Sequence, residues 1–234
     1  MLKFQQMEIL MEKYLEILRK CSLFDGIEEG NLIGMLGCLG AKVSCYEKNE
    51  TVIAEGEPAK YVGIVLSGAV QIEQTDYYGN RSIVAGIEPS ELFGESFACA
   101  GVEKIPVDVV ANEESEIMFI DCLRITQSCS SACSFHHRII YNLMKVVATK
   151  NLMFHQKIEV TSKRSTREKL LTYLLLQAKK NNSNRFEIPY DRQGLADYLE
   201  VERSGLSVEI GKLRREGVIE CGRRWFEVKS TNSK

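Results

Sequence analysis

Two cysteines followed by two histidines form the densest group of reactive side chains in the chain, at residues 129–137. In a helix, Cys129, Cys133 and His136 would share one face, since residues four and seven positions apart lie on the same side. Thiolate and imidazole groups at this spacing ligate zinc or iron, and the thiols also react with oxidants. Ordinary packing is the alternative, because cysteine is a common small core residue. The group therefore indicates a metal- or thiol-based sensor as an alternative function, and we assign no metal from the sequence.

A second group suited to chemistry lies at the start of a predicted helix near residue 203. Arg203 and Ser204 are followed by the apolar residues Leu206 and Ile210 at helical spacing. An arginine that pairs bidentately with guanine is the commonest specific contact to a base. We therefore predict that this helix recognises DNA and that Arg203 reads a base.

The residues before this helix complete a helix-turn-helix pattern. Leu195, Ala196 and Leu199 form the inner side of a short helix, and a tight corner at residues 200–202 leads to the second helix. In such modules the start of the second helix enters the major groove. Arg203 is predicted to contact a base edge, and Ser204 and Ser207 a base edge or a phosphate. Val208 suggests contact with a thymine methyl group or a different operator. Predicted phosphate contacts come from Arg192, Lys212, Arg214, Arg223 and Arg224, for which a plain solvated charge is the alternative.

Signatures of the common enzyme classes are missing from the sequence. It has no Gly-Lys-Ser/Thr loop to cradle a phosphate, no Gly-x-Ser-x-Gly elbow and no His-Glu-x-x-His motif. With three histidines in the whole chain, an acid–base arrangement is difficult to assemble. We therefore predict that the chain is not an enzyme.

The charge of the chain is unevenly divided. Residues 1–156 hold 13 Lys+Arg and 21 Asp+Glu, or −8, whereas residues 157–234 hold 17 and 11, or +6. This division predicts that nucleic acid contacts only the second part. No apolar run approaches the roughly 18 residues of a membrane span, and no secretion signal is recognisable. We expect a cytoplasmic chain without membrane contact, whose eight cysteines are reduced thiols.

The elements that position these groups follow from the periodicity of apolar residues. Helices are predicted at residues 5–20 and 28–39. From Ala41 the pattern changes to short apolar runs separated by glycine and polar turns, which is typical of an antiparallel roll or barrel. Strands are predicted at residues 51–54, 61–66, 69–72, 82–85, 107–110 and 117–120. Residues 1–133 are therefore expected to form an antiparallel, jelly-roll-like β-roll that senses a signal.

A long helix is predicted at residues 134–162, with an apolar seam of near-heptad spacing. A polar residue beside such a seam fixes the register of a helix pair, and we favour a homodimer because one helix-turn-helix reads few bases. A helix packed on its own roll is the alternative. The predicted seam comprises Ile140, Leu143, Val147, Asn151, Phe154 and Ile158.

The remaining residues, 163–234, are expected to form a DNA-binding domain after a polar hinge at residues 161–166. A helix at residues 168–179 and a strand at residues 186–189 precede the helix-turn-helix. Two apolar runs, residues 218–221 and 225–228, flank Gly222-Arg223-Arg224 and predict a hairpin wing. The fold class is α+β, with a β-roll, a dimerisation helix and a C-terminal winged helix-turn-helix.

This order of elements resembles the Crp/Fnr family of bacterial transcription regulators, which join a cyclic-nucleotide-binding-type β-roll to a winged helix-turn-helix. The resemblance covers about Leu23 to Val228. It is carried by Gly56 with Gly68, by Phe93-Gly94-Glu95, and by the segment from Leu195 that ends in Arg214-Arg215-Glu216-Gly217-Val218-Ile219. It implies a homodimer that binds a near-palindromic operator in double-stranded DNA, and contact with RNA polymerase if the chain activates transcription.

The resemblance also implies an effector pocket, and here the sequence departs from the family's pattern. Members that bind cyclic AMP carry an Arg-Ser pair that grips the phosphate, whereas this chain has Lys104-Ile105-Pro106, and proline lacks an N–H. Cysteines 21, 38 and 45 are too spread for the iron–sulfur members of the family. We therefore expect an unidentified effector other than cyclic AMP, with a cyclic-nucleotide-dependent regulator as the alternative. The predicted pocket comprises Phe93, Gly94, Glu95, Ser96, Lys104, Pro106 and Phe154.

Overall fold

The computed structural model describes residues 13–75, 77–78, 81–127 and 134–229. The chain divides into two compact units, Met1–Ala148 and Thr149–Lys234, with the boundary inside the long helix α6 (Ser134–Thr161). Each unit has its own hydrophobic core. The division into three segments at residues 133 and 162 stays a prediction.

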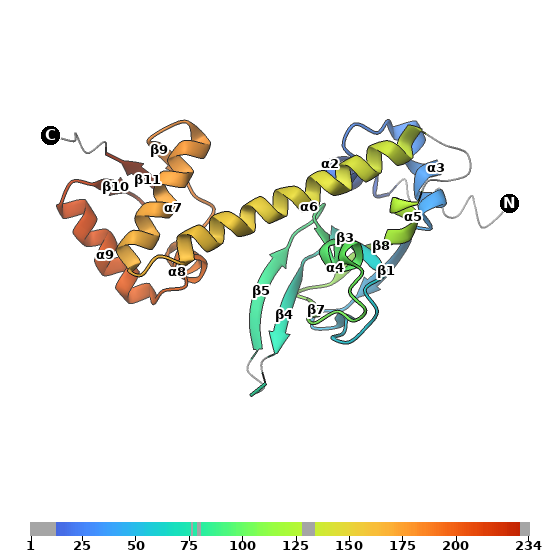
Figure 1. Cartoon of the computed structure of the whole chain (residues 1–234), viewed down its shortest axis with the longest axis horizontal. Coiled ribbons are helices and arrows are strands. Elements are labelled where there is room, and N and C mark those ends of the chain that lie inside the picture. Colours follow the sequence, from blue (N-terminus) through green and yellow to red (C-terminus); the bar gives the residue numbers. More distant parts are fainter. Residues whose placement is uncertain (1–12, 76, 79–80, 128–133, 230–234) are drawn as a thin grey trace. The chain divides into compact units, whose positions relative to one another are not determined.

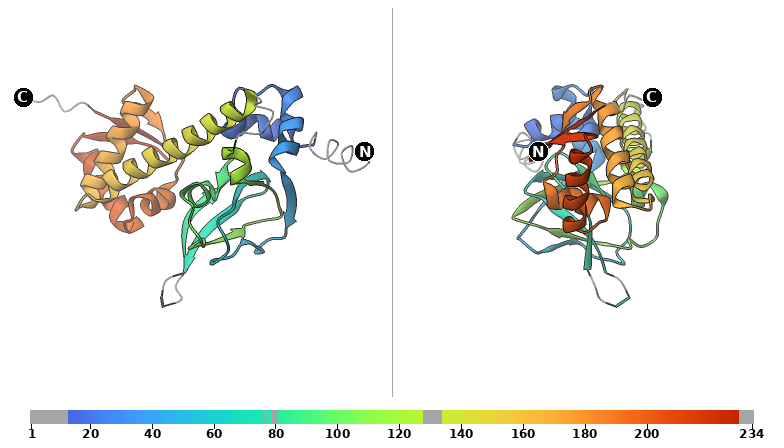
Figure 2. Two further views of the ribbon diagram at one scale, coloured as in Figure 1. Left: turned by 45° about the vertical axis from the view of Figure 1, so that its right-hand side comes forward. Right: turned by 90° about the vertical axis from the view of Figure 1, so that its left-hand side faces the viewer.

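Two antiparallel four-stranded sheets build the β-roll of the first unit (Figure 1 and Figure 2). One sheet has the order β1-β8-β3-β6 and the other has the order β2-β7-β4-β5. The strands of the first sheet are β1 (Lys42–Tyr46), β8 (Ser115–Asp121), β3 (Tyr61–Ser67) and β6 (Leu92–Phe93). Those of the second are β2 (Thr51–Ile53), β7 (Asp108–Ala111), β4 (Val70–Thr75) and β5 (Arg81–Ile87).

The two sheets enclose an apolar layer, because alternate residues of each strand point to opposite faces. Val65 and Ile117 of the first sheet share this layer with Val70 and Val109 of the second. Gly63 allows the ring of Phe93 to enter it, since a Cβ atom at Gly63 would lie 2.2 Å from Phe93 Cζ. The absence of a side chain at residue 63 is thus a packing requirement.

Helices cover the opposite face of the β1–β8–β3–β6 sheet. They are α2 (Leu15–Lys20), the 3₁₀ turn η1 (Ser22–Phe24), α3 (Glu29–Leu39) and the first part of α6, while α4 (Glu95–Ala100) and α5 (Cys122–Thr126) follow β6 and β8. Ile139 and Leu143 of α6 are buried in this layer. Between them on the helix, the buried side chain of Asn142 donates hydrogen bonds to the carbonyl oxygens of Leu23 (2.9 Å) and Asp25 (2.8 Å). Burial of this amide is offset because both donors are satisfied.

The second unit is a winged helix-turn-helix. It contains α7 (Thr166–Asn181), β9 (Arg185–Glu187), α8 (Arg192–Leu199), α9 (Arg203–Arg215), β10 (Ile219–Cys221) and β11 (Trp225–Val228). The strands form an antiparallel sheet of order β10-β11-β9. Ser165 begins α7 with a capping box, in which Ser165 and Glu168 each bond the other's backbone N–H.

The predicted fold class, the helices at 28–39 and 134–162, the roll and the winged helix-turn-helix are confirmed. Two strands were not predicted: β1, whose exposed and half-buried residues follow no clean alternation, and β6, which has only two residues. Of the helix predicted at residues 5–20, residues 5–12 lie outside the described part of the chain, and α2 covers its end.

The close approach at Gly63 gives a test of the roll's packing. Replacement Gly63→Ala should lower the free energy of unfolding by about 1–3 kcal/mol, because the added methyl group overpacks a buried ring. The matched control is Gly34→Ala, at an exposed position inside α3 with nothing within 4 Å of the added carbon. That change should stabilise the protein by up to about 1 kcal/mol. Urea unfolding curves measure both, and equal effects of the two changes would contradict this account.

Candidate functional site: the DNA-binding surface

The corner between α8 and α9 is held by polar contacts to the backbone. The Asp191 carboxylate caps α8 by accepting the Gly194 N–H at 2.8 Å. At the other end of α8, Glu200 has a left-handed backbone with φ 54°, which is unusual for a residue with a side chain. The Lys169 ammonium of α7 donates to the carbonyl oxygens of Leu199 (3.1 Å) and Glu200 (3.3 Å). The predicted corner is therefore present, and a side chain from α7 fixes it.

The start of α9 presents its side chains to solvent. Arg203, Ser204 and Ser207 are exposed, and Val208 has 57% of its surface accessible. Leu206 and Ile210, by contrast, are buried in the core of the unit, as the apolar spacing predicts. This face of α9 is thus free of contacts to the core and available to a partner.

The charges of Arg203 and of the wing residue Arg224 both act on Asp191 at the start of α8. The pKa of Asp191 is lowered by the backbone N–H groups of Gly194 and Gln193 and by the positive charges of Arg224 and Arg203. These two arginines come from different elements, the wing and α9, and their charges meet near one carboxylate. The helix-turn-helix and the wing therefore contribute to one positively charged edge.

The hydroxyl group of Ser207 is partly engaged within α9. It donates to the carbonyl oxygen of Arg203 at 2.9 Å, one helical turn earlier. Its oxygen still has lone pairs that can accept a hydrogen bond from a base or a water molecule. Among the predicted base-contacting residues, Ser207 is thus suited to accept and less suited to donate.

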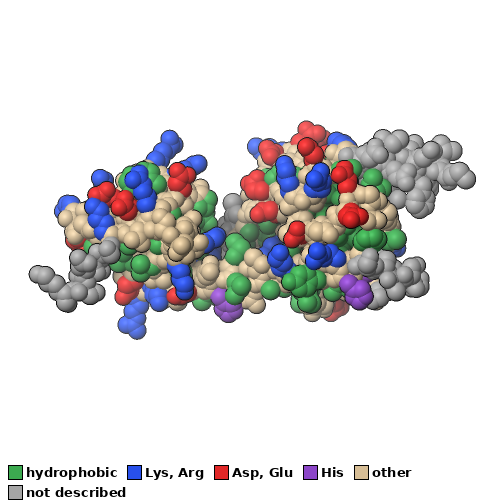
Figure 3. All heavy atoms as spheres, turned by 90° about the horizontal axis from the view of Figure 1, so that it is seen from above, with side chains coloured by type: hydrophobic (Ala, Val, Ile, Leu, Met, Phe, Trp, Pro, Cys, Tyr) green, Lys and Arg blue, Asp and Glu red, His purple; other side chains and the backbone are tan. Residues whose placement is uncertain are grey.

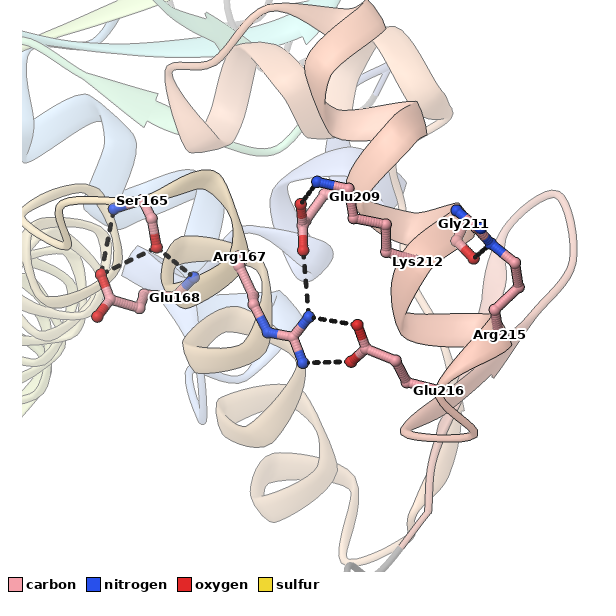
Figure 4. A network of polar contacts seen from close by, with 8 residues as sticks. All are labelled: Ser165, Arg167, Glu168, Glu209, Gly211, Lys212, Arg215 and Glu216. Atoms are coloured by element: carbon pink, nitrogen blue, oxygen red, sulfur yellow. Dashed lines mark hydrogen bonds and ion pairs between the residues drawn. The ribbon is translucent and has the colours of Figure 1, made fainter.

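The far end of α9 is anchored to α7 by an ion-pair network (Figure 4). Arg167 lies between Glu209 of α9 and Glu216 at the end of that helix. Its Nη1 is 3.3 Å from the Glu209 carboxylate and 3.0 Å from the Glu216 carboxylate. Glu209 also accepts a hydrogen bond from Lys212 at 3.2 Å. The network holds the part of the recognition helix that is remote from Arg203. It was not apparent from the sequence because the two glutamates lie 42 and 49 residues after Arg167.

The residues predicted to contact phosphate fall into two groups. Arg192 is half-buried: its Nη2 donates to the Gly222 carbonyl oxygen at 2.8 Å, and its guanidinium lies 4.9 Å from the ring centre of Phe226. This arginine therefore joins α8 to the wing, and its contact with phosphate stays a prediction. Lys212 is exposed but paired with Glu209. Arg214, Arg223 and Arg224 are exposed, as a phosphate contact requires.

Acidic side chains are spread over the face of the first unit that Figure 3 presents, interspersed with basic ones. The basic edge described above belongs to the second unit, in agreement with the division of charge in the sequence. Among the residues that the structure describes, no helix combines the length and the apolar character needed to cross a membrane.

The predicted effector residues occupy different environments. Phe93 and Glu95 are buried, and Ser96 donates to the Glu95 carboxylate at 3.2 Å. Lys104 and Pro106 are exposed, whereas Ile105 between them is buried in the layer enclosed by the sheets. In this segment Ile105 is the residue buried in the roll, while its two neighbours are exposed, and the role of Lys104 and Pro106 in a pocket stays a prediction.

Phe154 is also exposed, at 57%, and belongs to the second unit. A hollow of about 320 Å³ does exist in the first unit, and Ile105, between Lys104 and Pro106, is among the residues that line it. Aromatic side chains from β1, β3 and β8 line it together with two basic and two acidic side chains: Tyr46, Tyr61, Phe119, Lys42, Arg124, Glu57 and Asp121. The residues predicted from the family pattern are not part of this hollow.

The predicted cysteine and histidine group can be placed only in part, since Cys129 and Cys133 lie outside the described residues. His136 is buried at the start of α6, and its Nε2 lies 3.1 Å from the carbonyl oxygen of Arg124 in α5. The ring thus connects two helices. A metal- or thiol-based role for the group stays a prediction.

An exposed stripe runs along α6 on a side different from the buried one. Its members follow steps of three and four residues: Tyr141, Met144, Ala148, Asn151, His155 and Ile158. Met144 and Ile158 expose 61% and 62% of their surface. Of the predicted seam, Asn151, Phe154 and Ile158 are exposed, Ile140 and Val147 are half-buried, and Leu143 is buried in the core of its own unit. Leu143 therefore does not belong to an exposed seam.

Comparison with known proteins agrees with both halves of this description. Residues 43–130 match the family model of the cyclic nucleotide-binding domain, and residues 168–232 match that of the Crp-like helix-turn-helix domain. The chain belongs to the Crp/Fnr family of bacterial transcription regulators. As a member of this family it is a DNA-binding transcription regulator with a cyclic-nucleotide-binding-like domain.

Individual relatives of this Crp/Fnr regulator are distant. It is 24% identical over 183 residues to the transcriptional activator protein FnrL of Cereibacter sphaeroides, covering 74% of this chain and 71% of that one. It is 31% identical over 80 residues to the CRP-like cAMP-activated global transcriptional regulator of Mycobacterium tuberculosis, covering 34% of this chain and 35% of that one. The solved structure of CprK with bound OCPA has the same fold, with a TM-score of 0.62 at 12% identity over 85% of this chain and 88% of that one.

The ion pair between Arg167 and Glu216 predicts a pH-dependent contribution to stability. The hydrogen bond and charge of Arg167 lower the pKa of Glu216, so the contribution is complete above the ordinary glutamate pKa and is lost as the pH falls through the lowered value. At pH 7 we expect Glu216→Gln to unfold at a lower denaturant concentration than wild type. Near pH 3 the two proteins should unfold at the same denaturant concentration. Fluorescence of Trp225, the single tryptophan of the chain, reports this unit.

Glu103→Gln, an exposed carboxylate in the first unit, is the control and should leave the transition unchanged. The difference between wild type and Glu216→Gln should also shrink with added salt. A difference that is independent of pH would show that the ion pair does not stabilise α9.

Proposed function

We propose that this regulator works as a homodimer on a near-palindromic operator, with one recognition helix in each half-site. The observation that carries the proposal is the exposed stripe of α6, whose steps of three and four residues are those of a helix that pairs with a second helix. Asn151 lies within this stripe, and a polar residue at such a position fixes register between paired helices. A two-fold pair of recognition helices matches the two-fold symmetry of a duplex.

A test of the dimer introduces charge into the stripe. The double change Met144→Glu with Ile158→Glu should raise the dimer dissociation constant by about two orders of magnitude or more, because a buried unpaired charge costs several kcal/mol. Leu123→Glu is the control, since Leu123 of α5 is also 61% exposed and lies outside the stripe. Sedimentation at several concentrations measures the dissociation. A double variant that remains as dimeric as the control would exclude this interface.

We propose that Arg203 reads a base, because it lies at the exposed start of α9 and its charge acts on Asp191 together with that of the wing residue Arg224. Replacement by alanine should cost about 1–3 kcal/mol of binding to the selected operator, and less on unrelated duplex DNA. Arg215→Ala is the control, because Arg215 is an exposed arginine at the far end of the same helix, where its Nε donates to the Gly211 carbonyl oxygen. Operator fragments selected from genomic DNA serve as probe in gel-shift titrations. Equal losses for both variants on the operator would contradict base reading by Arg203.

The proposed effector is a small molecule other than cyclic AMP. The segment that would hold a cyclic phosphate turns Ile105 inward and leaves Lys104 and Pro106 exposed, so it directs neither a cation nor an N–H of residue 106 into the roll. Calorimetry with cyclic AMP and cyclic GMP should therefore show no binding at micromolar concentrations. Micromolar binding of either nucleotide would instead establish the alternative, a cyclic-nucleotide-dependent regulator.

A signal bound in the first unit would act by changing the relation between the two recognition helices. In this proposal the chain is not an enzyme, it works in the cytoplasm where bacterial DNA lies, and it contacts RNA polymerase if it activates transcription. The support for these points is the membership in a family of transcription regulators.

A further inference from the structure

Two cysteine side chains from separate parts of the first unit meet in the fold. Cys99 lies in α4 and Cys122 begins α5, and their sulfur atoms are 3.7 Å apart. The two residues are 23 positions apart in the chain, so their contact is a product of the tertiary structure. A disulfide bond of about 2.0 Å requires the two sulfurs to approach by less than about 2 Å.

We propose that Cys99 and Cys122 form a redox modification site, in which a hydroperoxide converts the two thiols into a reversible intramolecular disulfide. The observation behind the proposal is the direct contact of two thiols with opposite accessibility. Cys99 is exposed to solvent, whereas Cys122 is 5% exposed. An oxidant therefore reaches one sulfur of the pair, and the second is held against it from inside.

The environment of the pair decides the order of the steps. Burial, together with the neighbouring Cys99 and Asp121, raises the pKa of Cys122 to about 12, so this group remains a thiol at neutral pH. The thiolate is the form that attacks a peroxide. Accessibility therefore selects Cys99 as the sulfur that reacts first, and the raised pKa of Cys122 disfavours attack by the buried sulfur.

The chemistry balances with one molecule of hydrogen peroxide. The Cys99 sulfur attacks a peroxide oxygen, the O–O bond breaks, and the products are a sulfenic acid and one water molecule. The Cys122 sulfur then attacks the Cys99 sulfur, an S–S bond forms, and the S–O bond breaks. The departing hydroxide takes the proton of the Cys122 thiol and leaves as a second water molecule. Two electrons pass from the sulfurs to the peroxide, and a dithiol reverses the change.

A disulfide bond between Cys99 and Cys122 would join helices α4 and α5 of the first unit. Cys99 lies in the helix that begins with Gly94 and the buried Glu95, and Cys122 lies at the start of α5. The carbonyl oxygen of Arg124 in α5 is in turn 3.1 Å from Nε2 of His136 in α6. Helix α5, which carries Cys122, is therefore in contact with the long helix α6 through Arg124 and His136. The chemical proposal itself does not depend on DNA binding or on dimer formation.

Peptide mapping of the full chain tests the proposal. Trypsin places Cys99 alone in the peptide 82–104 and Cys122 alone in the peptide 105–124, so a crosslink between them identifies the bond without ambiguity. The reduced protein is treated with hydrogen peroxide, quenched with an alkylating agent and digested without reductant. The expected result is a linked pair of these two peptides that disappears with dithiothreitol and is absent from Cys99→Ser, a change at an exposed position that leaves the fold intact.

Two further measurements distinguish a cysteine pair that the fold positions from unspecific oxidation of exposed thiols. In Cys122→Ser, dimedone should trap several-fold more Cys99 sulfenic acid than in wild type, because the resolving thiol is missing. In urea that unfolds the protein, the linked pair should fall to the level of crosslinks that involve the exposed Cys38 and Cys45. The proposal is overturned if peroxide oxidises Cys99 in the folded wild type while Cys122 stays an alkylatable thiol, or if the linked pair forms equally well in urea.

Discussion

One face of the long helix α6 is buried by its own fold, and an exposed stripe that includes four apolar side chains is left uncovered. Ile139 and Leu143 are buried in the first unit, and Val160 near the end of the same helix is buried in the core of the second. The exposed stripe from Tyr141 to Ile158 lies on the remaining side. Exposed apolar side chains in such a row are costly to leave in water, so this constraint points to a second helix as the partner. The proposed arrangement of recognition helices depends on it.

The DNA-binding unit fixes its recognition helix at both ends and leaves the reading face open. Lys169 holds the corner before α9, and Arg167 holds the residues toward its end. The left-handed backbone at Glu200 costs about 1–2 kcal/mol, which the surrounding hydrogen bonds and the packing of Leu199 offset. Arg192 connects α8 to the wing in a similar way, because its guanidinium donates a hydrogen bond to the Gly222 carbonyl oxygen. A rigid support beneath exposed side chains reduces the entropy lost on binding DNA.

Much of the fold could be predicted because local periodicity and turn chemistry are strong in this chain. The helix-turn-helix was placed within a few residues, since Leu195 and Leu199 in α8, and Leu206 and Ile210 in α9, each repeat at helical spacing. Periodicity does not reveal which of two apolar faces is buried, and for that reason Leu143 was placed in the seam. Contacts between residues that are far apart in the sequence could not be predicted either. The bond from Arg192 to the wing carbonyl and the meeting of Cys99 with Cys122 each require the tertiary structure.

In the proposed dimer, α6 pairs two chains and so sets the separation of the two recognition helices. Hydroxyl-radical footprinting on an operator fragment selected from genomic DNA tests it most directly. The account predicts two protected regions related by two-fold symmetry, with centres about one helical turn, or roughly 10 base pairs, apart. A single protected region, bound by a chain that sediments as a monomer on the same DNA, would contradict the claim.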